Sequence, residues 1–120
     1  MTTTHPIRLD LSQAIATDHT IEAERITQGN PRVGHVSAYD RPERGIYMGQ
    51  WASEPGAWTI SYTEDELVVI LSGRGELVSD DGSVFAYKAG DAFVVPSGFK
   101  GQWVTIETTR KIYSITHPIS

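Results

Sequence analysis

The sequence predicts an all-β fold, a single antiparallel barrel preceded by an N-terminal arm. From Gly45 onward, short runs rich in β-branched and aromatic residues alternate with turn-forming residues. The turns recur at the spacing typical of a β-sandwich or barrel. No long amphipathic helical pattern follows Gly45. A chain of 120 residues has the size of one domain, so we expect an arm over residues 1–44 and one barrel over residues 45–120.

The predicted arm has scattered apolar residues and turn formers rather than a core pattern. Leu9, Leu11 and Ile15 suit a short strand or a helical turn, and the pattern is too brief to decide between them. Open sheet edges invite pairing, so we expect the arm to cover an edge of its own barrel or of a partner. This predicts a homodimer. The apolar residues available for such a contact are Ile7, Leu9, Leu11, Ile15, Val33 and Val36.

Eight short strands are predicted in the barrel. The tripeptide Asp80-Asp81-Gly82 predicts a tight hairpin, since Asp-Gly tolerates positive φ values. A sharp bend is expected at Gly73-Arg74-Gly75 and a turn at Pro96-Ser97-Gly98. The predicted strands are 46–52, 58–62, 66–71, 75–79, 84–87, 92–95, 101–106 and 111–116.

Glu66 is the most informative residue. It opens the run Glu-Leu-Val-Val-Ile-Leu, which is apolar on both faces of a strand and therefore suits a central strand. A carboxylate at its start lies either in solvent at the barrel mouth or inside the barrel with a partner. If Lys111 points inward, as its shared parity with Tyr113 allows, it is the natural counter-ion for Glu66.

The turns and Glu66 together resemble the two cupin motifs. Glu66 and Gly73, separated by six residues, resemble the end of the first motif, and Gly90-Asp91 followed by Pro96-Ser97-Gly98 resembles the second. Residues 45–117 are similar to small single-domain cupins related to ureidoglycine aminohydrolase cupin domains. The resemblance implies a double-stranded β-helix, the RmlC-like jelly-roll barrel.

The sequence departs from this family at the metal ligands. The family pattern places two histidines before the glutamate, at Ile60 and Tyr62 or at Thr59 and Ser61, and a third at Gly101. Of the four ligands that the resemblance implies, Glu66 alone is present, and one carboxylate is too few for a transition metal. We therefore expect no metal and no other cofactor.

The four histidines lack the spacing of metal ligands. His5, His19 and His35 lie in the arm, and His117 follows the last predicted strand. His35 is the exception to watch, because a strand in the arm that joined the sheet would point it inward. The absence of cysteine excludes thiolate chemistry and disulfides.

The aromatic residues suggest an organic ligand in place of the metal. With Glu66 and Lys111 as candidate catalytic residues, they would form a concave pocket with a few polar groups, although aromatic residues also serve ordinary core packing. The candidate ligand-binding residues are Trp51, Trp58, Tyr62, Trp103 and Tyr113.

Three functional hypotheses follow. The preferred one is a metal-independent cupin that binds a small polar metabolite; the others are an aminohydrolase- or isomerase-type enzyme with an irregular metal site, and a packed dimerisation or scaffold barrel. The net charge of −5 argues against nucleic acid as a partner. No stretch approaches a signal peptide or a membrane span, so we expect a cytoplasmic protein without a membrane partner.

Overall fold

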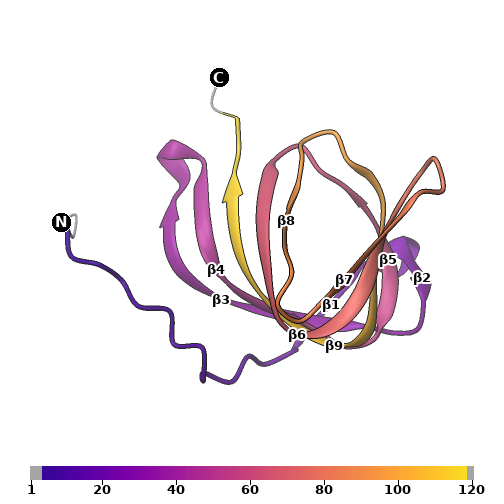
Figure 1. Cartoon of the computed structure of the whole chain (residues 1–120), viewed down its shortest axis with the longest axis horizontal. Helices are drawn as coiled ribbons and strands as arrows, with labels where there is room; N and C mark the ends of the chain where they lie inside the picture. The colour runs from indigo at the N-terminus through magenta and orange to yellow at the C-terminus, as the bar shows by residue number, and fades with distance from the viewer. Residues whose placement is uncertain (1–3, 119–120) are drawn as a thin grey trace.

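The computed structural model describes residues 4–118. It confirms the all-β fold (Figure 1). Two single-turn 3₁₀ helices are the only helices among these residues, and neither has the length or apolar character that crossing a bilayer requires. The elements are β1 (His19–Thr20), η1 (Ala23–Arg25), β2 (Ile26–Gln28), β3 (Arg32–Arg41), η2 (Pro42–Arg44), β4 (Ile46–Ser53), β5 (Gly56–Ser61), β6 (Asp65–Ser79), β7 (Val84–Lys88), β8 (Ala92–Val95) and β9 (Lys100–Thr116).

Two long antiparallel strands, β6 and β9, organise the barrel. They pair from Asp65 with Thr116 to Ser79 with Gly101. The first half of β6 and the second half of β9 form one layer with β8, β4, β3 and β1. Their other halves form the facing layer with β7, β5 and β2. The two layers enclose the core (Figure 1).

The predicted turns are present, but two of the predicted strand breaks are wrong. Gly82 has φ +89° in the hairpin between β6 and β7, and Gly98 has φ +96° in the turn before β9. At Gly73 the φ of +88° and several register shifts bend β6 without ending it, because β9 continues to pair on the other side of the bend. The predicted strands 66–71 and 75–79 are therefore one strand, and so are 101–106 and 111–116.

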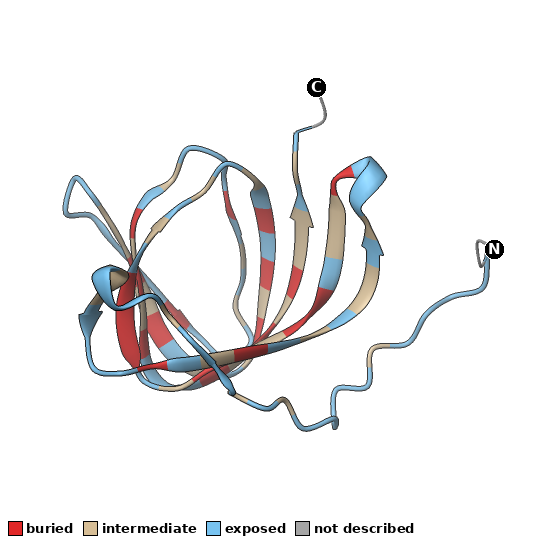
Figure 2. Cartoon of the chain, turned by 180° about the vertical axis from the view of Figure 1, so that it is seen from behind, coloured by how far each residue is buried: buried red, intermediate tan, exposed pale blue. Residues whose placement is uncertain are grey.

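The predicted arm contains a long strand of the sheet. Strand β3 pairs with β4 from Val33 with Ser53 to Arg41 with Ile46, so position 44/45 lies inside a β-hairpin. Residues 9–15 form no strand and no helix, and the chain makes a single hydrogen-bonded turn between Asp10 and Gln13. Before β1 the chain runs along the outside of the barrel and is largely exposed (Figure 2).

The core lies between the two layers in the half of the barrel nearest β5 and β7. Strand alternation places Val68 and Ile70 inward from β6, at 0% and 1% exposure, while Leu67 faces outward. Buried and exposed bands alternate along the strands in Figure 2. The remaining buried members of this cluster are Trp58, Leu77, Tyr87, Val95 and Trp103.

Candidate functional site

Glu66 points into the barrel, which is one of the two positions considered for it from the sequence, and is 3% exposed. The Tyr62 hydroxyl donates a hydrogen bond to Glu66 Oε1 over 2.7 Å, and the Lys111 ammonium donates one to Oε2 over 2.8 Å. Both donors were candidates from the sequence. Because each carboxylate oxygen already has a charged or hydroxyl donor, Glu66 is stabilised inside the barrel as an anion.

Lys111 is as buried as its partner, at 5% exposure. Its Nζ lies 4.5 Å from the ring centroid of Trp51 and 4.4 Å from that of Trp103. The two indoles attract the ammonium through their π faces, and this attraction is strongest where water is excluded. Lys111 therefore has three sources of compensation for its lost hydration: one carboxylate and two aromatic rings.

Tyr62 remains a hydrogen-bond donor over the whole physiological range. Burial is the main reason that its pKa lies far above the usual value of a tyrosine, and the negative charge of Glu66 raises it further. Burial also raises the pKa of Tyr113. Both phenols are accordingly neutral in the site.

A cavity of about 520 Å³ opens above this ion pair. Five of the residues singled out from the sequence line it: Trp51, Tyr62, Glu66, Lys111 and Tyr113. This volume lies within the range of small-molecule sites.

Trp58 and Trp103 lie elsewhere. They are 4% and 2% exposed in the core, and together with Trp51, Tyr62 and Lys111 they line a smaller cavity of about 200 Å³. Trp103 reaches the site through its ring contact with Lys111. These two indoles therefore do not line the larger cavity.

Strand β3 contributes three cavity residues, of which sequence analysis considered only His35. His35 pairs with Trp51 across β3 and β4 and lines the cavity together with Ser37 and Asp40. Inward orientation of His35 was foreseen on the condition that the arm joined the sheet. Further lining residues are Tyr47, Glu64, Ile115 and His117.

The residues at the metal-ligand positions of the cupin pattern do not fit a metal. Of the two pairs of positions considered for the first two histidines, Ile60 and Tyr62 are the pair that faces the barrel interior. Ile60 packs against the core, whereas Thr59 and Ser61 are exposed. Tyr62 is already bonded to Glu66. A Cβ on Gly101 would collide with the Val78 carbonyl oxygen, so a histidine would require the backbone to move.

The described part of the chain offers no alternative metal site in place of the missing cupin ligands. Among residues 4–118 there is no group of three or more histidine, cysteine, aspartate or glutamate side chains placed to hold a metal ion. Glu66 Oε2 is instead bonded to the Lys111 ammonium over 2.8 Å. The site has the chemistry of an internal ion pair.

Comparisons with known proteins identify the family. The family model described as the EutQ-like cupin domain matches residues 41–113. A DUF861 family protein from Pseudomonas syringae pv. tomato has a similar structure, with a TM-score of 0.80 and 21% identity over 90% of this chain and 46% of that one. This chain therefore spans less than half the length of that protein.

Two further structures share the fold. The EutQ protein of Clostridium difficile has a TM-score of 0.71 and 15% identity, covering 96% of this chain and 88% of its own. A putative ethanolamine utilization protein from Salmonella typhimurium has a TM-score of 0.64 and 20% identity, covering 71% and 69%. The sequence matches no curated protein.

Proposed function

This chain belongs to the EutQ-like cupin domain family, and on that premise we propose that its barrel binds a small, amine-bearing polar metabolite without a metal. The observation that carries the proposal is the cavity of about 520 Å³ over the buried Glu66–Lys111 pair. A barrel that served only as a packed scaffold would not need an open cavity lined with ionisable groups.

The charge of the cavity favours a cation. Its lining contains three carboxylates, Asp40, Glu64 and Glu66, and a single ammonium, that of Lys111. The carboxylates and the ammonium together give the lining a net charge of −2 (three negative groups against one positive). A partly enclosed cleft of one sign concentrates ligands of the opposite sign.

The polar atoms at the cavity floor also suit N–H donors. Each oxygen of Glu66 accepts one hydrogen bond and retains a further lone pair, and the Tyr62 oxygen can accept as well as donate. Trp51 supplies an aromatic wall beside them. The resemblance to ureidoglycine aminohydrolase cupin domains supports the same ligand class, since ureides are rich in N–H groups.

Three probes of similar size and different charge test the proposal. Ethanolamine, ethylene glycol and glycolate are titrated at millimolar concentration while the melting temperature and the heat of binding are recorded. Ethanolamine is chosen as the cation because the Salmonella protein is named for its utilization. We expect ethanolamine to raise the melting temperature most and glycolate least.

Two variants assign the effect to the cavity. Glu66→Gln should weaken ethanolamine binding, because it removes the central negative charge, whereas Glu107→Gln, at an exposed position on β9, should leave binding unchanged. Preferential binding of glycolate would show that the cavity selects anions and would overturn the proposal. Absence of binding by all three probes would also count against it.

A further inference from the structure

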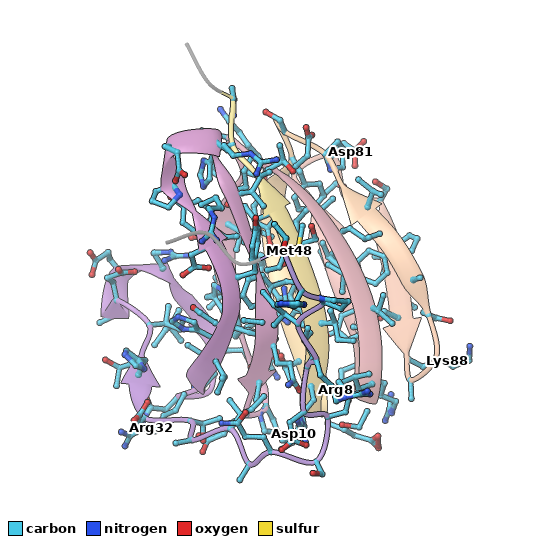
Figure 3. The ribbon with its side chains drawn as sticks, turned by 90° about the vertical axis from the view of Figure 1, so that its left-hand side faces the viewer. Arg8, Asp10, Arg32, Met48, Asp81 and Lys88 are labelled. Carbon is cyan, nitrogen blue, oxygen red and sulfur yellow. The ribbon has the colours of Figure 1, made fainter. Side chains whose placement is uncertain are left out.

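One row of residues that lines the cavity has a carboxylate at each end. Asp40 of β3 pairs with Tyr47 of β4. Tyr47 pairs on its other side with Ile115 of β9, which in turn pairs with Glu66 of β6. All four side chains line the cavity, and we call them the cavity row. Figure 3 shows the four strands side by side from the outer side of the sheet, where Met48 lies.

The two carboxylates of the cavity row are too far apart to share one cationic group. Neighbouring strands lie about 4.8 Å apart, so the Cα atoms of Asp40 and Glu66 are about 14 Å apart along the sheet. The sheet curls around the cavity, which brings inward-pointing side chains closer together than their Cα atoms (Figure 1). No three acidic or histidine side chains of residues 4–118 are placed to hold one metal ion. The negative charge is therefore spread along the cavity.

Tyr113 lies within electrostatic reach of both ends of the row. It precedes Ile115 by two residues on β9 and lines the same cavity. Burial raises the pKa of Tyr113, and the negative charges of Asp40 and Glu66 raise it further. The two carboxylates therefore face the same part of the cavity, with the neutral phenol beside them.

Each end of the row has a net charge of −1. At one end Lys111 compensates Glu66 at 2.8 Å, and Glu64 adds a further negative charge near Tyr62, the phenol that donates to Glu66. At the other end Asp40 is alone. Neither Asp40 nor Glu64 forms an ion pair with another residue in the range 4–118. A ligand with two separated positive charges matches this distribution, whereas a monoamine leaves one end uncompensated.

The middle of the row is suited to a hydrocarbon chain. Tyr47 and Ile115 lie between the two carboxylates, and both are half-buried. Methylene groups resting on them would remove apolar surface from water on both sides. The order of the row is thus acidic, aromatic, aliphatic and acidic, which complements an ammonium group, a methylene chain and a second ammonium group.

From these observations, and resting on the proposed function, we infer that the ligand is a linear aliphatic diamine. One ammonium group binds at Glu66, on the cavity floor. The methylene chain lies over Ile115 and Tyr47, and the second ammonium group binds Asp40 on the edge of the sheet.

Isothermal titration calorimetry with putrescine and butylamine tests the inference on the full chain. The two probes have the same carbon chain and differ in the second amine. We expect putrescine to bind about fivefold more tightly, which is the scale of a solvent-exposed ion pair such as that with Asp40. This preference should shrink at high salt, because an exposed pair is screened.

Asp40→Asn should bring the affinities for putrescine and butylamine close to each other and leave the binding of ethanolamine, which has one amine, nearly unchanged. Asp80→Asn is the matched control, because Asp80 is also an exposed aspartate but lies in the hairpin between β6 and β7, outside the cavity lining. This variant should keep the fivefold preference. Melting temperatures of both variants check that the fold is retained.

Equal affinities of the wild type for putrescine and butylamine would overturn the inference, and ethanolamine binding in the same series would show that the proposed function stands without it. A preference for putrescine that survives Asp40→Asn but is lost in Glu64→Gln would also overturn it, because the second ammonium group would then lie at Glu64. Failure of every amine to bind would refute the inference together with the proposed function.

Discussion

Glu66→Gln removes the negative charge of the buried pair and keeps a side-chain oxygen that can accept the Tyr62 hydroxyl. The Lys111 ammonium then remains 5% exposed, with the two indoles but no anion to compensate it. Breaking a buried pair from one side typically costs 3–5 kcal/mol. Because the indoles retain part of the compensation, we expect the free energy of unfolding to fall by about 3 kcal/mol.

The complementary change, Lys111→Met, leaves the Glu66 carboxylate with Tyr62 as its remaining protein donor, and we expect a loss of similar size, about 3 kcal/mol. The double variant removes both charges and places an apolar side chain between Trp51 and Trp103. Its loss should therefore be well below the sum of the two single losses, with a coupling energy of about 2–3 kcal/mol.

Urea unfolding monitored by tryptophan fluorescence measures all four proteins of this cycle, and unchanged m-values confirm that each unfolds from an equally compact state. If the losses of the single variants simply add, within about 0.5 kcal/mol, then the two charges do not stabilise each other and the reasoning from burial is wrong. If Glu66→Gln alone is neutral, the carboxylate is solvated rather than paired.

Two further predictions concern the tyrosines and Gly101. Burial raises the pKa of Tyr87 to about 12, so above about pH 10 the unfolded chain loses the phenolic proton while the folded chain keeps it. The free energy of unfolding should therefore fall by about 1.4 kcal/mol per pH unit for each such tyrosine above about pH 10. Measured by urea unfolding, this dependence on pH should be shallower in Tyr87→Phe. An unchanged dependence would contradict the assignment to Tyr87. Gly101→Ala should cost about 2–3 kcal/mol because its Cβ collides with a carbonyl oxygen of β6, whereas Gly98→Ala, with φ +96° and no atom within 4 Å, should cost about 1 kcal/mol. Equal melting temperatures for these two variants would show that β9 yields more easily than its packing indicates.

Local chemistry explains what the sequence could predict. The Asp81-Gly82 and Pro96-Ser97-Gly98 turns are determined by residues that lie next to each other, and both are present. The resemblance to the cupin motif favoured an inward Glu66, whereas strand alternation alone left its position open and allowed Lys111 to be its partner; both side chains are buried. These inferences required no knowledge of which strands pair.

Strand β3 could not be recognised in the same way. Its inward-facing residues include His35 and Ser37, which line a cavity instead of packing into a core, so the apolar alternation that signals a strand is missing. The continuity of β6 through Gly73 was hidden for a related reason: the glycine suggests a break, but the hydrogen bonds that carry the strand past it come from β9. The cavity residues Ser37 and Asp40 were therefore missed together with their strand, and His35 was considered only on the condition that the arm joined the sheet.

The long β6–β9 ladder has a consequence for the order in which the protein folds. Ser79 and Gly101 are 22 positions apart along the chain (101 − 79), whereas Glu66 and Lys111 are 45 apart. Closing the shorter loop loses less chain entropy, and the β7 hairpin shortens it further, so we expect pairing to start at that end and to proceed toward Glu66. On this order the ion pair forms after the main barrier to folding, and we expect substitutions of its members to accelerate unfolding while leaving the rate of folding nearly unchanged.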